Sequence, residues 1–426
     1  MNRGLVILLA ALAAVRILTA VALWPSLRSP DHPWAWSNND GYDRIAATWV
    51  ETGIYGSAPG IPTATRTPAY PALLAAARIL SGGHDSQPLA TAIQILLSLA
   101  TGWMIHRTAR LFFSETASRI ALALFILNPQ AGLLALRCST ETLFCFLVTG
   151  FVFHIARLQR DARPRDAWLA AAWLGMALLT RPTPFLLPLV LAPAFIRQWR
   201  RDGRASRAWL HLAGAACLAL AILSPWLARN AALGAGFPTL ETWRGRSLFH
   251  GVHVTAKLDR FLSGQSTLTE LDEEAGRIYT AWLCAYRHTA PGSRGPLARE
   301  RWESDMGARL GAWAMTESPR LTATRTARNV LLAPFLQMTR RSTVALAAFN
   351  GPLLLLAFAG LRLAARSTPG GFLVLAPVVC ALLYFWLLHA LVWPQARYVL
   401  PGLLPFTIFA GHALAEFTAM RIANRR

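Results

Sequence analysis

Residues 68–80, PAYPALLAAARIL, form an apolar stretch whose interpretation decides how often this chain crosses a membrane. The stretch is 13 residues long, has two prolines among its first four residues and carries Arg78. A helix needs about 20 consecutive apolar residues to span a bilayer. At this length the stretch is better interpreted as a helix that lies at the membrane interface.

The rest of the chain is too apolar for a soluble domain of 426 residues. Hydrophobic residues make up 54% of it and charged residues only 15%, and the mean hydropathy is +0.37. We therefore expect an all-α integral membrane protein with about ten transmembrane helices and interfacial helices on the outer face. The predicted spans are residues 5–24, 89–106, 117–136, 139–156, 167–181, 183–196, 208–227, 344–361, 371–391 and 397–418.

The basic residues predict the orientation of these spans. The formal net charge is +21, and almost all of the basic residues are arginine, with Lys257 as the single lysine. With 68–80 left out of the spans, Arg3 and five arginine-bearing segments fall on one face. These segments are 106–119, 157–166, 197–207, 361–367 and the C-terminal tail. The positive-inside rule then predicts a multi-pass protein of the plasma (bacterial inner) membrane with both termini in the cytoplasm.

Other partners and sites find little support in the composition. No basic-aromatic patch indicates nucleic acid, despite the high net charge. The five cysteines contain no CxxC pair, so neither a disulfide framework nor a zinc site is predicted. The first apolar run lacks an A-x-A cleavage site and is interpreted as a retained signal anchor.

Three regions follow from this organisation. Residues 1–227 form an N-terminal transmembrane module that includes a first external loop, 25–88; residues 228–343 form an external, partly helical region; and residues 344–426 form the C-terminal transmembrane helices. In the external region, 271–287 and 298–317 have the pattern of amphipathic helices, and 325–341 suits an interfacial helix.

The predicted orientation places several acids on the outer face. Asp40 and Asp43 lie in NNDGYDRIA, just before a predicted helix, and Glu141 lies at the mouth of an apolar helix. Each has an ordinary interpretation, because Asn-Asp-Gly is a turn signal and Asp often caps a helix. Glu141 could likewise pair with Arg137, one helical turn earlier. An acid at the mouth of an apolar helix also often faces a cavity or a partner.

Arg181, Arg229 and Arg397 lie at the outer ends of predicted spans, and Arg66 lies in the first external loop, just before 68–80. Taken singly, each is more often an anchor that reaches for lipid headgroups. Acids together with several arginines suit a lipid phosphate beside a group that needs a base, because the guanidinium fork binds phosphate with two parallel hydrogen bonds. A carboxylate there could take the proton of a hydroxyl that attacks a sugar's anomeric carbon.

The order of these motifs resembles the GT-C glycosyltransferases of the dolichyl-phosphate-mannose mannosyltransferase and aminoarabinose transferase (ArnT-like) type. The resemblance runs from residue 1 to about 240 and returns in the last 30 or so residues. The motifs that carry it are DGYDRIA (40–46), TGIY (52–55), RTPAYP (66–71), Gly83, Gln94, TETLF (140–144), RPT (181–183), PWLARN (225–230), Gly234 and RYVLP (397–401).

The resemblance implies roles for these residues. Asp40 would be the general base, with Asp43 as the alternative acid, and Glu141 would orient the acceptor or the base. Arg66, Arg229 and Arg397 would hold the lipid phosphate. The further substrate-binding candidates are Tyr42, Tyr70, Arg181, Asn230 and Tyr398.

The implied reaction is a single displacement with inversion. The donor would be a polyprenyl-phosphate-linked sugar, and the acceptor a lipid, glycan or protein at the outer face of the membrane. No cofactor is implied, and two carboxylates in separate loops are a weak signal for a metal.

One departure and two alternatives stay open. In some relatives the base lies four residues before the tyrosine, where this chain has Asn38. The alternatives are a transporter or flippase for a lipid-linked saccharide or another anionic lipid, and a structural or assembly protein. A transporter would place polar groups near the middle of the bilayer and would usually show paired repeats.

Overall fold

The computed structural model describes residues 3–29, 35–36, 40–83, 85–161, 163–201, 205–292, 295–368 and 371–424. In these ranges the regular secondary structure is helical apart from one hairpin, in which β1 (Gly56–Ala58) pairs antiparallel with β2 (Ile61–Pro62). The all-α class predicted from the sequence is therefore confirmed.

Helices follow one another along the whole described chain. Those of the first half are α1 (Arg3–Arg28), α2 (Tyr42–Thr52), α3 (Ala69–Leu80), α4 (Gln87–Phe112), α5 (Glu115–Leu127), α6 (Pro129–Leu134), α7 (Glu141–Asp161), α8 (Pro164–Leu178), η1 (Thr183–Leu186), α9 (Leu187–Arg201) and α10 (Ala205–Ala232). Those of the second half are α11 (Arg244–Ala256), α12 (Leu258–Leu262), α13 (Leu268–Ala285), η2 (Arg287–Thr289), α14 (Ala298–Thr316), α15 (Pro319–Leu332), α16 (Arg340–Ser367), α17 (Phe372–Val392) and α18 (Ala396–Ala423).

Each of the ten predicted spans lies mostly in helices, and the described residues contain seven helices long and apolar enough to cross a membrane. These seven are α1, α4, α7, residues Leu210–Ala232 of α10, α16, α17 and α18. The other three predicted spans correspond to the shorter helices α5 with α6, α8, and η1 with α9. The stretch 68–80 forms the 12-residue helix α3, which is too short to span a bilayer.

Prolines explain two differences from the predicted boundaries. The run 117–136 is not one helix, because Asn128 precedes Pro129 and adopts an extended conformation. The Asn128 side chain then caps α6 by accepting a hydrogen bond from the Ala131 N–H. The helix predicted at 325–341 instead starts at Pro319 and ends at Leu332, two residues before Pro334.

Arg16 shows how a charged residue is accommodated inside the first span. Its side chain is buried, its Nε donates to the Ser98 hydroxyl of α4 at 3.3 Å, and its guanidinium lies 5.6 Å from the ring centre of Phe125 in α5. A buried charge needs polar or aromatic partners in a membrane. Arg16 therefore fixes the rotation of α1 against its two neighbours.

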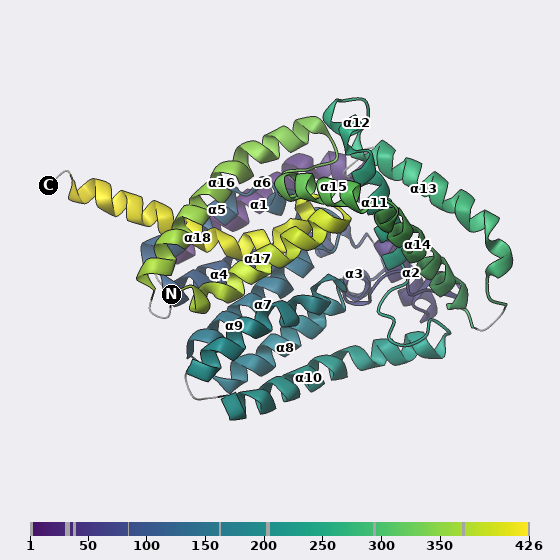
Figure 1. The fold of residues 1–426 in the computed structure, drawn as a ribbon, viewed down its shortest axis with the longest axis horizontal. Helices are drawn as coiled ribbons and strands as arrows, with labels where there is room; N and C mark the ends of the chain where they lie inside the picture. The colour runs from purple at the N-terminus through teal and green to yellow at the C-terminus, as the bar shows by residue number, and fades with distance from the viewer. Residues whose placement is uncertain are drawn as a thin grey trace.

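Figure 1 shows how the elements are arranged. Both termini lie at one end of the helical bundle, and α11, α13 and α14 lie at the other end, near α2. The long helices α4, α7, α17 and α18 run between the two ends around a shared apolar core. The segments that follow α6 and α8 therefore reach the same end as α11 and α14.

A close helix contact holds the C-terminal part together. A Cβ on Gly360 of α16 would stand 1.8 Å from the carbonyl oxygen of Phe409 in α18. Gly351, in the same helix, has no atom within 4 Å of the corresponding position. Only the first glycine is therefore required by packing.

We expect Gly360→Ala to lower the thermal unfolding midpoint of the detergent-solubilised protein, since α16 and α18 must separate at a cost of about 1–3 kcal/mol. Gly351→Ala is the matched control and should be neutral or stabilising by up to about 1 kcal/mol, the gain in helix propensity. Equal midpoints for the two variants would contradict this close contact.

Candidate functional site

A glycine turn and two packed tyrosine rings position the segment that begins at Asp40. Gly41 adopts the left-handed conformation, with φ of 82°, and α2 begins directly after it at Tyr42. The buried Tyr42 ring packs edge-on against Tyr70 of α3, with ring centres 5.3 Å apart. The Tyr70 hydroxyl donates to Gln94 Oε1 of α4 at 3.1 Å. This stack fixes the start of α2 above the bundle.

Arg66 connects this segment to Trp243, which follows α10. Its Nε donates to the backbone carbonyl of Asp40 at 3.1 Å, and its Nη2 lies 3.9 Å from Asp40 Oδ1. The guanidinium also lies 5.3 Å from the ring centre of Tyr42 and 4.3 Å from that of Trp243. Arg66 is largely buried, whereas the Asp40 side chain is 64% exposed. The Asp40 carboxylate is thus accessible beside a fixed cation.

Glu141 forms the second part of the site, at the first residue of α7. Its side chain is only 2% exposed, and its Oε1 lies 2.7 Å from Arg181 Nη2 and 3.9 Å from Arg397 Nε. Arg181 Nε also donates to the Thr140 hydroxyl at 2.5 Å. A buried carboxylate needs such partners, because an unpaired charge in a low-dielectric interior is costly.

Tyr398 lies between the two arginines. Its ring centre is 5.3 Å from the Arg181 guanidinium and 4.7 Å from that of Arg397, whose Nη2 donates to the Tyr398 hydroxyl at 2.7 Å. Glu141 Oε2 and Arg397 Nε are also buried in this cluster. The Ser139 side chain and the charge of Arg397 both act on the Glu141 carboxylate there.

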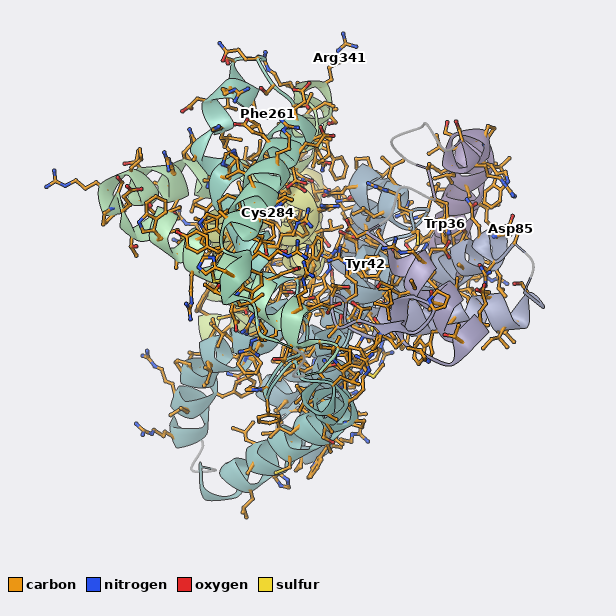
Figure 2. All side chains as sticks on the ribbon, turned by 90° about the vertical axis from the view of Figure 1, so that its right-hand side faces the viewer. Trp36, Tyr42, Asp85, Phe261, Cys284 and Arg341 are labelled. Carbon is orange, nitrogen blue, oxygen red and sulfur yellow. The ribbon has the colours of Figure 1, made fainter. Side chains whose placement is uncertain are left out.

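The two parts act as one electrostatic cluster. Burial raises the pKa of the Tyr42 hydroxyl, and the charges of Arg66, Asp40, Arg181 and Glu141 all act on it. Asp40 also interacts electrostatically with Arg397. Figure 2 shows Tyr42 between the N-terminal helices, in purple and blue, and the green helices that follow α10. The structure therefore brings together Asp40, Tyr42, Arg66, Tyr70, Glu141, Arg181, Arg397 and Tyr398.

Asp43 has different neighbours. Burial raises the pKa of the Asp43 carboxyl; Arg78 lowers it and Asp85 raises it further. Figure 2 places Asp85 at the outer edge of the molecule, away from Tyr42. Of the two aspartates, Asp40 is the one that Arg66 holds. Asn38 lies outside the described residues.

Arg229 and Asn230 hold the loops instead of joining this cluster. Arg229 donates to the carbonyls of Tyr55 and Thr63 at 2.8 Å each, and its guanidinium lies 4.7 Å from the ring centre of Trp226. Asn230 is buried, and its Nδ2 donates to the Thr239 carbonyl at 2.9 Å. These donors of Arg229 bind loop backbone, and its phosphate contact stays a prediction.

The cluster also contains three residues that the motifs did not single out as site residues. Burial raises the pKa of the Glu241 carboxyl, against the lowering effect of Arg66, Arg181 and Arg244. Trp243 stacks on Arg66, as described above. Arg137 interacts electrostatically with Arg397, Glu141 and Asp40. Glu241 and Trp243 lie between the matching motifs Gly234 and RYVLP (397–401), so no sequence pattern pointed to them.

The charges of the whole cluster favour an anion. Four guanidinium groups, those of Arg66, Arg137, Arg181 and Arg397, face three carboxylates, those of Asp40, Glu141 and Glu241. The excess of one positive charge lies in a partly buried site, where electrostatic attraction is stronger than in water. A phosphate group fits this arrangement.

Comparisons with known proteins place this geometry in context. Residues 65–228 match the family described as dolichyl-phosphate-mannose-protein mannosyltransferase. No curated protein sequence matches the chain. The archaeal oligosaccharyltransferase AglB from Archaeoglobus fulgidus, in complex with an inhibitory peptide and a dolichol-phosphate, has a similar structure with a TM-score of 0.56. That match has 15% sequence identity and covers 99% of this chain and 51% of AglB.

Two further structures are similar. The apo form of the Archaeoglobus fulgidus oligosaccharyltransferase gives a TM-score of 0.56 at 16% identity, over 99% of this chain and 51% of that one. ArnT from Cupriavidus metallidurans bound to undecaprenyl phosphate gives 0.43 at 16% identity, over 95% of this chain and 78% of ArnT. This chain spans about half the length of the oligosaccharyltransferases that it matches. The predicted GT-C resemblance is confirmed by the family match, and the fold by the oligosaccharyltransferase structures.

We expect Arg181→Ala to destabilise the protein more than Arg397→Ala, as measured by thermal unfolding in detergent. Removing Arg181 breaks the 2.7 Å pair and leaves the buried Glu141 carboxylate with a partner only at 3.9 Å. Breaking a buried pair costs about 3–5 kcal/mol. The double variant Arg181→Ala, Glu141→Gln should recover part of this loss. An Arg181→Ala protein as stable as Arg397→Ala would contradict the pairing.

Proposed function

We propose that this protein is a membrane glycosyltransferase that moves a sugar from a polyprenyl-phosphate donor to an acceptor, with inversion at the anomeric carbon. The observation that carries the proposal is the convergence of Asp40, Arg66, Glu141, Arg181 and Arg397 at one end of the helical bundle. The family match over residues 65–228 supports this class of reaction. The similar AglB structure, which contains a dolichol-phosphate, supports a lipid phosphate as ligand.

The arginines would bind the phosphate of the donor. Arg66, Arg181 and Arg397 come from three separate segments, and aromatic rings hold each guanidinium in place. Fixed guanidinium groups suit a phosphate because no rearrangement is needed as negative charge develops on the leaving group. The polyprenyl chain would extend into the surrounding lipid.

Asp40 would act as the general base. The oxygen of an acceptor hydroxyl attacks the anomeric carbon, and its proton passes to the Asp40 carboxylate. The bond between that carbon and the phosphate oxygen breaks, and its electron pair stays on the polyprenyl phosphate. The exposed position of Asp40 allows an acceptor to approach from solution. Glu141 would orient the acceptor or the base from the buried side of the site.

The site would face the outer side of a bacterial inner membrane. Figure 1 shows both termini at the end of the bundle opposite α11 and α14. The positive-inside rule assigns the arginine-rich connections and termini to the cytoplasm. Residues 1–227 and 344–426 would then hold the membrane spans, and 228–343 the external region.

Replacing Asp40 by Asn should reduce sugar transfer by about 100-fold or more, since general-base catalysis contributes about 10²–10⁴-fold. Transfer is measured in proteoliposomes with undecaprenyl phosphates that carry single hexoses or pentoses, and with a membrane extract of the gene-deletion strain as acceptor. Asp43→Asn is the matched control and should retain transfer.

Full activity of Asp40→Asn together with loss in Asp43→Asn would move the base to Asp43. Movement of undecaprenyl phosphate between vesicle leaflets, with no sugar transfer for any donor, would contradict the enzyme assignment and identify the protein as a flippase.

We also expect Arg66→Ala and Arg397→Ala each to weaken the binding of undecaprenyl phosphate about tenfold or more, since a hydrogen bond to a charged group contributes about 1.5–3 kcal/mol. Binding is measured by fluorescence titration of the protein in nanodiscs. Arg78→Ala is the control, because Arg78 pairs with Glu51 on the outside of α3. An equal loss in all three variants would point to general charge attraction instead of a phosphate site.

A further inference from the structure

The segment 239–243, which follows α10, is fixed to the site by its backbone and by two side chains. Trp226 Nε1 donates to the Leu240 carbonyl at 2.7 Å. The Thr242 N–H donates to the Ala64 carbonyl at 2.8 Å, and the Thr242 hydroxyl to Glu300 Oε2 at 2.9 Å. Trp243 covers the Arg66 guanidinium at 4.3 Å. The residue inside this segment, Glu241, is therefore held next to the arginines.

Glu241 and Glu300 differ in how their carboxylates are used. Glu300 accepts hydrogen bonds from the Thr63 hydroxyl, the Ala64 N–H and the Thr242 hydroxyl, so it joins two loops. The Glu241 carboxylate forms no hydrogen bond and no ion pair with any residue in the described part of the chain. The nearby charges that act on it are those of Arg66, Arg181 and Arg244.

A partly buried acid without a hydrogen-bond partner has lost hydration that no hydrogen bond replaces. A carboxylate only accepts hydrogen bonds, and like charge prevents it from binding the donor phosphate. The group that fits beside it is a hydroxyl, which donates a hydrogen bond and carries no charge. Sugars supply such groups in both the donor and any glycan acceptor.

We propose that Glu241 is a specificity-determining residue that binds a sugar hydroxyl of the substrate, next to the arginines that hold the phosphate. This inference rests on the proposed glycosyltransferase function. In this arrangement the arginines recognise the lipid phosphate, which all donors share, whereas Glu241 recognises the sugar.

The test uses Glu241→Gln in the same proteoliposome and nanodisc assays, with Glu300→Gln as the comparison variant. We expect Glu241→Gln to raise KM about tenfold or more, because it removes a hydrogen bond to a charged acceptor. Binding of undecaprenyl phosphate alone should be unchanged or tighter, since a neighbouring negative charge is removed. Glu300→Gln, which loosens two loops, should weaken phosphate binding and transfer together.

The separate KM values identify the source of the hydroxyl. A higher KM for the undecaprenyl-phosphate sugar places the hydroxyl on the transferred sugar, and a higher KM for the deletion-strain extract places it on the acceptor. Unchanged values for both substrates would overturn the inference, as would parallel losses of phosphate binding and transfer in Glu241→Gln. Failure of the proposed function looks different, because the wild-type protein would then neither bind undecaprenyl phosphate nor transfer sugar.

The pH dependence gives a second readout. Burial keeps the pKa of Glu241 above its ordinary value of 4.5, while Arg66, Arg181 and Arg244 oppose this rise. The carboxylate is therefore lost as pH falls through the raised pKa, and the wild-type KM should increase on the acid side. Glu241→Gln should lack this increase. An identical acid-side increase in both proteins would assign it to another group and overturn the role of Glu241.

Discussion

The buried Glu141 carboxylate is the constraint on which the site depends. It lies at the first residue of α7 with almost no exposure, and it pairs with Arg181 at 2.7 Å and with Arg397 at 3.9 Å. In a low-dielectric interior none of these charges is tolerable alone. The pairs therefore tie three segments together, namely the start of α7, the turn after α8 and the start of α18. That arrangement creates a cationic surface at one end of the bundle.

Helices α10 and α14 complete the site by holding loops that have little regular structure. Glu300 of α14 connects the loop after β2 to the segment after α10, and Arg229 of α10 binds two carbonyls of the segment between α2 and α3. Trp243 then reaches Arg66 from the opposite side. Loops carry function only where a rigid scaffold positions them. Here the scaffold consists of α10 and α14, whose side chains bind loop backbone directly.

The position of the polar groups, at one end of the bundle, favours the proposed enzyme over a transporter. A transporter binds its substrate near the middle of the membrane, whereas the clustered acids and arginines of this protein belong to the loops and helix starts. Arg16 is the buried charge within α1, and it contacts Ser98 and Phe125. These contacts give Arg16 a packing role between three helices. The proposed sugar transfer takes place at the end of the bundle where Asp40 and the clustered arginines lie.

The sequence alone determined the helical class, the ten apolar runs, the short α3 and most members of the charged cluster, because run length, hydropathy and motif order are local properties. It could not decide which charged side chains bind other parts of the protein and so serve its structure. Arg229 matches a family motif as well as Arg66 does, yet its donors bind the carbonyls of Tyr55 and Thr63. Glu241 matched no motif and still joins the cluster, since tertiary packing of α10 against the first loop brings it there. The role of each charged side chain depends on which backbone carbonyls and charges from distant segments lie beside it. Only the folded chain brings those segments together.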